Sequence, residues 1–141
     1  MSKLKPITLT NREFVEIYKG LTAVKDVKSS RFAIIVARNL KELTSKLSYI
    51  ESMATPSDKF RELSMEASKY IESEDLDNLT KLEEENKELI DDRKQQLLEI
   101  EEELDSEATI YLEEIREDQL PEDLTPNQLF PILKLIKNDS E

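Results

Sequence analysis

Apolar residues recur at helical spacing along most of this chain. Val36, Leu40, Leu43, Leu47 and Ile50 follow a 4-3-4-3 spacing, which places them on one helix face. Such a face packs against another helix at a shallow crossing angle. Similar stripes run through residues 14–24, 60–71 and 76–104. The pattern predicts a mainly α fold, built as a long antiparallel helical hairpin or coiled-coil-like bundle.

Local sequence signals predict where several helices begin. Thr10-Asn11-Arg12-Glu13 fits a capping box, in which the Thr10 hydroxyl accepts from the Glu13 backbone and the Glu13 carboxylate reaches back. Thr55-Pro56 and Thr125-Pro126 each combine a capping residue with a proline suited to the first helical position. We therefore expect helices to begin after Thr10, Thr55 and Thr125.

The stripe from residue 76 to residue 104 has a polar middle. As one unbroken helix it would be about 43 Å long at ~1.5 Å per residue. Asn86, Arg93 and Gln96 occupy columns that otherwise hold leucine and isoleucine. Polar residues there either fix helix register and oligomeric state, or indicate a segment that buries little. The sequence leaves both alternatives open.

Two short segments differ from the helical pattern. Residues 5–9 include the β-branched Ile7 and Thr8 and have a proline near their start, as in a strand or extended arm. Residues 108–112 fit either a strand that pairs with residues 7–9 or more helix, so a two-stranded β pair from the arm and residues 108–113 is one outcome. The length predicts a single domain over 1–141. Its expected parts are an extended arm at 5–9, a basic helical half at 11–53, an acidic long helical region at 56–104 and a C-terminal strand or helix with a cap at 107–138.

Charge is sorted along the chain. Residues 1–50 carry ten Lys/Arg and four Asp/Glu, a net charge of +6, whereas residues 51–141 carry ten and twenty-eight, a net charge of −18. Opposite charge draws the two parts together, and the overall excess of acid repels nucleic acid. We therefore expect protein partners and no direct contact with nucleic acid.

The composition excludes several kinds of chemistry. Cysteine and histidine are both absent, which removes thiolate nucleophiles, zinc clusters and the usual general base near neutral pH. The densest carboxylates flank the apolar columns, and we interpret them as a solvated acidic surface rather than a metal site. They are Glu83, Glu84, Glu85, Glu101, Glu102 and Glu103. We expect no enzyme, no cofactor and no metal.

The apolar stripes supply the candidate core. We expect one set of residues to form the core of the bundle or the seam through which copies assemble, and we call this set the core seam. It consists of Phe32, Val36, Leu40, Leu43, Leu47, Leu97, Ile100 and Leu104. No window approaches a membrane span and the first ten residues lack a signal-peptide core, so we expect a protein of the reducing cytoplasm with no membrane contact.

Three stretches carry a resemblance to small tailed-bacteriophage proteins. They read TLTNREFVEIYKGL, SSRFAIIVARNLKEL and LEEIREDQLPEDLTPNQL. The most recognisable positions are Arg31, Phe32, Ala33, Arg38, Asn39 and Leu40. The resemblance implies a phage accessory, assembly or virion protein that binds other proteins and itself, in the host cytoplasm or in the virion. An acidic phage inhibitor of a host defence or nucleic-acid-binding protein, with a DNA-mimic-like surface, is the alternative.

Overall fold

The computed structural model describes residues 4–137 and is mainly helical, with a small antiparallel sheet. This confirms the expected fold class. The chain divides into two compact units, where the sequence predicts one domain. Unit 1 is Met1–Ser48 with Leu104–Glu141, and unit 2 is the intervening Tyr49–Glu103. Each unit is described by itself below.

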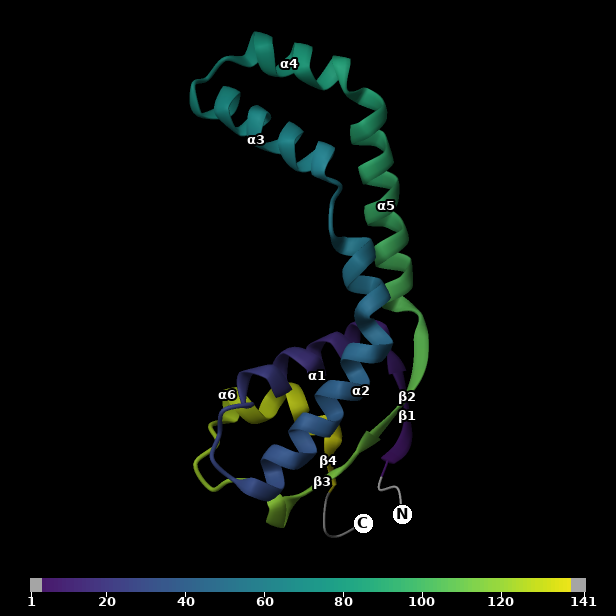
Figure 1. Cartoon of the computed structure of the whole chain (residues 1–141), viewed down its shortest axis with the longest axis vertical. Helices are drawn as coiled ribbons and strands as arrows, with labels where there is room; N and C mark the ends of the chain where they lie inside the picture. Colours follow the sequence, from purple (N-terminus) through teal and green to yellow (C-terminus); the bar gives the residue numbers. More distant parts are fainter. Residues whose placement is uncertain (1–3, 138–141) are drawn as a thin grey trace. The chain divides into compact units, whose positions relative to one another are not determined.

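Unit 1 combines helices from the start of the chain with strands and short helices from its end (Figure 1). Helix α2 begins in this unit and α5 ends in it. Its elements are β1 (Leu4–Thr10), α1 (Asn11–Ala23), α2 (Ser30–Ala54), the end of α5 (Lys87–Asp105), β2 (Glu107–Glu113), β3 (Ile115–Arg116), η1 (Glu117–Gln119), α6 (Pro126–Leu129), η2 (Phe130–Leu135) and β4 (Ile136–Lys137).

Two segments that lie far apart in the sequence pair in a sheet. Strand β1 pairs antiparallel with β2 in a register that places Ile7 opposite Ile110 and Thr8 opposite Thr109. The two threonine hydroxyls are 2.7 Å apart on the exposed face, which is a stabilising cross-strand pair. Residues 108–112 therefore form a strand and not a further helix. Strands β3 and β4 add a short parallel pair, with Ile115 opposite Ile136.

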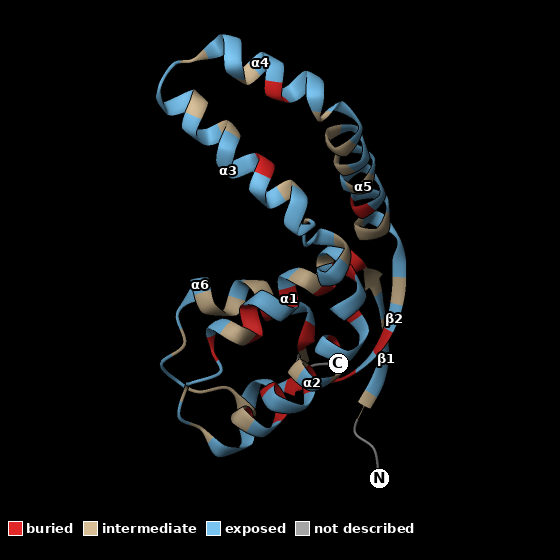
Figure 2. Ribbon diagram, turned by 45° about the horizontal axis from the view of Figure 1, so that its top comes forward, coloured by how far each residue is buried: buried red, intermediate tan, exposed pale blue. Residues whose placement is uncertain are grey.

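The capping box predicted at Thr10 is present. The Glu13 amide donates to Thr10 Oγ1 at 3.2 Å, and the Thr10 amide donates to the Glu13 carboxylate at 3.2 Å. This cap holds the first turn of α1, whose inner face then contributes buried residues such as Phe14 and Ile17. Figure 2 shows buried residues of unit 1 along α1, α2 and β2. The chain therefore forms its larger core here.

Gly20 lets the end of the chain pack closely on α1. A Cβ atom at this position would lie 2.6 Å from Pro131 Cβ and 2.9 Å from Ile132 Cγ2. Both distances are shorter than real Cβ contacts, and the proline ring has little freedom to move. The only glycine of the chain is thus required by the neighbour that crosses it, η2.

We predict that Gly20→Ala destabilises the protein although alanine favours helix. The helix propensity gain is about 1 kcal/mol, whereas overpacking against Pro131 costs about 1–3 kcal/mol. Urea unfolding followed by circular dichroism should show a lower midpoint. Lys19→Ala, at an exposed position of the same helix, is the control and should leave the midpoint nearly unchanged. A Gly20→Ala protein more stable than the parent would contradict the close packing.

Unit 2 consists of the end of α2, then α3 (Asp58–Glu72), α4 (Leu76–Glu85) and most of α5. Helices α3 and α4 form a hairpin (Figure 1). The turn between them is a Schellman motif, because the Asp75 amide donates to the Tyr70 carbonyl and the Glu74 amide to the Ile71 carbonyl. Glu74 has φ of 58°, a left-handed conformation that usually calls for glycine or asparagine.

The cap expected at Thr55 is wrong. Helix α3 begins at Asp58, and the Ser57 hydroxyl accepts from the Phe60 amide at 3.2 Å. The Thr55 hydroxyl instead donates to the Glu51 carbonyl of the preceding helix. Pro56 therefore lies in the connection between α2 and α3 rather than in a first helical turn.

The stripe from residue 76 to residue 104 is not one straight helix. It breaks at Asn86, which has φ of −118° and separates α4 from α5. The Asn86 side-chain amide donates to the Leu82 carbonyl at 2.9 Å, and the Asn86 backbone amide donates to the same carbonyl at 3.2 Å. A side chain that bonds the preceding turn is a known cause of helix bending. The first polar residue of the column is thus the site of the bend.

Candidate binding surfaces

The structure separates the core seam residues. Phe32, Val36, Leu43 and Leu47 are buried in unit 1, and Ile100 is buried in unit 2. Leu40 and Leu104 are only partly buried. The core interpretation of Leu97 is wrong, because its side chain is 46% exposed. As a surface for assembly, the seam stays a prediction.

The polar residues in the middle of the long stripe explain why Leu97 is exposed rather than part of the core. The least exposed column of α5 runs through Leu89, Arg93, Gln96 and Ile100, a 4-3-4 spacing that leaves Leu97 beside it. Arg93 donates to the Ala54 carbonyl at 2.9 Å, at the last residue of α2, and to Gln96 Oε1 at 2.6 Å. Its guanidinium also lies over the Phe60 ring, 5.8 Å from the centroid. Polar residues therefore occupy the inner face of α5 where leucines were expected to pack.

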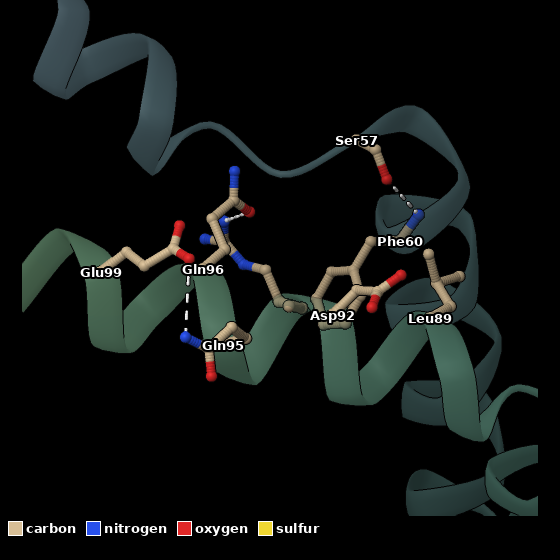
Figure 3. A pocket seen from close by; sticks show the side chains of 8 residues that line it. Ser57, Phe60, Leu89, Asp92, Gln95, Gln96 and Glu99 are labelled. Atoms are coloured by element: carbon tan, nitrogen blue, oxygen red, sulfur yellow. Dashed lines mark hydrogen bonds between the residues drawn. The ribbon is translucent and has the colours of Figure 1, made fainter.

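A hollow of about 480 Å³ lies between the start of α3 and the middle of α5. Figure 3 shows Ser57 and Phe60 on one side and Leu89, Asp92, Gln95, Gln96 and Glu99 along α5 on the other. Its polar groups are largely used within the protein, since Gln95 donates to Glu99 and Ser57 caps α3. Arg93, which also lines it, is likewise bonded within unit 2, to Gln96 and to the Ala54 carbonyl.

Unit 2 buries few apolar side chains. Among its described residues, four large apolar side chains are buried and six are exposed, whereas the described part of unit 1 buries fourteen and exposes five. The buried four are Ile50, Leu63, Leu82 and Ile100, and the exposed six are Tyr49, Met65, Ile71, Leu76, Leu97 and Leu98. Of the two alternatives left open for the polar middle, this supports a segment that buries little.

Two of the exposed residues flank the turn between α3 and α4. Ile71 is 59% exposed at the end of α3, and Leu76 is 68% exposed at the start of α4. On α3, Met65 borders a second hollow, of about 440 Å³, together with Glu62, Glu66, Lys69 and Tyr70. The hairpin therefore presents apolar groups among carboxylates.

The net charge of the protein is concentrated in unit 2. This unit carries 18 Asp/Glu and 7 Lys/Arg, a net charge of −11, whereas unit 1 carries 14 and 13, a net charge of −1. Unit 1 is nearly neutral because it joins the basic start of the chain to an acidic later segment. Among the described residues, four ion pairs link the two segments, and in the last of them the acid belongs to the start of the chain. These pairs are Lys5 with Glu114, Arg12 with Asp105, Arg38 with Glu113 and Lys134 with Glu13.

The carboxylates that the sequence predicted as an acidic surface lie in unit 2, and most of them are exposed. Glu83, Glu84 and Glu85 lie exposed at the end of α4, and Glu101 and Glu102 are exposed on α5. Glu103 is half-buried and accepts from the Tyr49 hydroxyl at 2.6 Å. Among residues 4–137, no group of three or more carboxylates is placed to hold a metal ion.

A third hollow, of about 320 Å³, lies in unit 1 and is lined by three arginines. We call it the arginine hollow, and its lining consists of Arg31, Ile34, Ile35, Arg38, Glu113, Arg116 and Gln119. Helix α2 supplies the first four, and the segment from β2 to η1 supplies the others. From sequence alone, Arg31 and Arg38 are interpreted as a solvated helix face. Their seven-residue spacing puts them on one face, but nothing in the sequence indicates that Arg116 joins them.

Asn39 fixes the segment that borders this hollow. Its side-chain amide donates to the Glu113 carbonyl at 2.9 Å and accepts from the Glu113 amide at 2.8 Å. The Asn39 side chain is completely buried. It therefore satisfies both backbone groups of Glu113, the last residue of β2. The one available signal was its position, four residues before Leu43 in the apolar column.

Comparison with known proteins finds no matching family model, no matching curated protein and no matching solved structure. Over the described ranges, no helix combines the length and apolar character needed to cross a bilayer.

Proposed function

We propose that this protein is a non-enzymatic binding protein whose unit 2 binds a partner protein with a basic surface. The observation that carries the proposal is the composition of unit 2. Its described residues expose six large apolar side chains, bury four, and lie in a segment with a net charge of −11.

The exposed apolar residues supply the contact energy of such a surface. Single exposed leucines are ordinary on soluble proteins, but a unit of this size with so few buried side chains has little core of its own. A partner that covers Ile71 and Leu76 would gain about 1.5–3 kcal/mol for each fully buried side chain. The turn between α3 and α4 is thus the natural centre of the contact.

Charge determines the chemistry of the partner. A second copy would bring another unit of net charge −11 to the same contact, and like charges in an interface oppose binding. A basic surface is attracted instead, and association of this kind weakens as salt is added. A basic partner suits an acidic inhibitor of a nucleic-acid-binding protein better than self-assembly. A phage accessory or virion role, and a place in the host cytoplasm, stay predictions.

The test compares two matched pairs of exposed residues. Tagged protein captures partners from a bacterial lysate, and the captured protein is then purified and titrated alone against the chain. We expect one basic protein that binds saturably and more weakly at higher salt. The double variant Ile71→Gln/Leu76→Gln should weaken binding by at least about tenfold. Phe130→Gln/Leu133→Gln, an equally apolar and exposed pair in unit 1, should leave it unchanged.

Other results would reject the proposal. An acidic partner, equal loss in both double variants, or no binding once the captured protein is purified would each contradict it. Light scattering on the purified chain tests whether a second copy of the chain occupies this surface instead. A defined oligomer that Ile71→Gln/Leu76→Gln dissociates would show that a second copy covers this surface.

A further inference from the structure

We infer that the arginine hollow of unit 1 binds the phosphate group of a small phosphate ester. Three guanidinium groups and two isoleucines line one cavity of about 320 Å³ there. This site lies within unit 1 and is independent of the partner surface proposed for unit 2.

The hollow is a local concentration of positive charge on an acidic protein. Arg31, Arg38 and Arg116 line it together with a single carboxylate, Glu113. Glu113 is paired with Arg38 at 3.1 Å, and Asp118, outside the lining, is paired with Arg116 at 3.3 Å. Within residues 4–137, the Arg31 side chain has no ion-pair or hydrogen-bond partner. An anion that enters the hollow would supply the missing partner.

The position of Arg31 is unfavourable in the absence of an anion. Helix α2 begins at Ser30 and has no acidic residue in its first turn, so Arg31 lies at the positive end of the helix dipole. A cation at that end destabilises a helix, and an anion bound there is favoured. Both the side chain and the helix end therefore select for negative charge.

The arrangement of the three arginines favours phosphate over carboxylate. A carboxylate is planar and is satisfied by one bidentate guanidinium. A phosphate monoester has three terminal oxygens that point in different directions, and guanidinium groups from separate positions around a cavity can bind them together. Here two positions are on α2 and the third, Arg116, is on β3.

Hydrogen bonds hold the backbone that frames the hollow, and its arginines keep N–H groups for a ligand. Asn39 holds the Glu113 backbone through two buried hydrogen bonds, and Gln119 Oε1 accepts from the Arg116 amide at 2.9 Å. The Arg38 and Arg116 side chains are both more than half exposed. Arg116 is paired with the exposed Asp118 at 3.3 Å, and such pairs contribute little stability, so Arg116 can turn to a ligand at small cost. Arg38 stays paired with Glu113, whose side chain is only 6% exposed, and it can offer a ligand the N–H groups that this pair does not use.

The apolar lining indicates an ester rather than free phosphate. Ile34 is 50% exposed at the cavity, and Ile35 lies buried beside it. A cavity of this size accommodates a small ligand that has an apolar part. The hydrocarbon part of a phosphate ester would cover Ile34 and remove it from water.

The experiment is calorimetric titration of the full chain, in low-chloride buffer, with three probes. They are phenyl phosphate, inorganic phosphate and benzoate. We expect saturable binding of phenyl phosphate, weaker binding of inorganic phosphate and the weakest binding of benzoate. Absence of saturable phenyl phosphate binding would overturn the inference, and so would benzoate bound as tightly as phenyl phosphate.

Three variants locate the site. Arg31→Gln should weaken phenyl phosphate binding by about tenfold or more, because a charge-assisted contact is lost. Lys41→Gln removes the same charge from an exposed position of α2 outside the hollow, and it should have no effect. Ile34→Ala should reduce only the advantage of phenyl phosphate over inorganic phosphate. Circular dichroism confirms that each variant is folded, and equal losses in Arg31→Gln and Lys41→Gln would reject the hollow as the site.

Discussion

Leu43→Asp is expected to unfold unit 1, whereas Leu40→Asp should leave a folded but weaker protein. Leu43 is completely buried and Leu40 is only partly buried. Removing a buried leucine costs about 2–5 kcal/mol, and an unpaired buried carboxylate adds a large desolvation penalty. Because total stability is about 5–15 kcal/mol, Leu43→Asp removes most or all of it. We expect Leu40→Asp to cost about 1–2 kcal/mol.

The two variants are a matched pair. Both place aspartate within the same helix, so the loss of helix propensity is common to them and the difference reports burial. Circular dichroism and urea midpoints measure that difference. Glu84→Gln, at an exposed position of α4, should change stability by no more than about 0.5 kcal/mol. Equal effects of Leu40→Asp and Leu43→Asp would contradict the burial seen in α2.

The second large effect is expected for Asn39→Leu. Leucine has the same number of side-chain heavy atoms in a similar branched shape, but it leaves both the Glu113 amide and the Glu113 carbonyl without the partners they have at 2.8 and 2.9 Å. Each unpaired buried backbone group costs about 1–3 kcal/mol, so the loss of both partners should cost about 2–6 kcal/mol. The urea midpoint should fall, and the Glu113 amide should exchange its hydrogen far faster.

Asn86→Leu is the matched control. The substitution is the same and the position is again an apolar column, but Asn86 is only partly buried and bonds a carbonyl of its own helix. Its loss should cost no more than about 1 kcal/mol. If Asn39→Leu proved as mild as Asn86→Leu, with the Glu113 amide still protected, the pairing of α2 with β2 would not stabilise unit 1.

Local signals in the sequence predicted local structure well. The capping box at Thr10 and the capping residue with proline at Thr125 are present, because a cap depends only on residues within one turn. At Thr55 the same signal was wrong, since Ser57 caps α3 instead. The pairing of residues 7–9 with residues 108–110 was one of two alternatives and is observed. It could be foreseen because only two short segments had β-branched content outside the helical stripes.

What depends on packing between distant residues was not predictable in the same way. Periodicity places Leu97 near an apolar column, yet the least exposed face of α5 runs through Arg93 and Gln96. Arg93 donates to the Ala54 carbonyl and to Gln96 Oε1. The same periodicity cannot show that Asn39 meets the backbone of Glu113. Arg116 joins Arg31 and Arg38 only because β3 lies beside α2. Such positions are set by tertiary contacts that no spacing rule encodes.

Unit 1 is discontinuous along the chain, and this has a consequence for the order of folding. Strand β1 is made first, but its partner β2 follows about a hundred residues later. Closing so long a loop carries an entropy cost that grows with its length, and contacts between distant residues slow folding. Unit 2 is contiguous, and its hairpin needs no residue from either end of the chain. On the ribosome the hairpin can therefore form first, and each turn of helix it forms shortens the span that β1 and β2 must close.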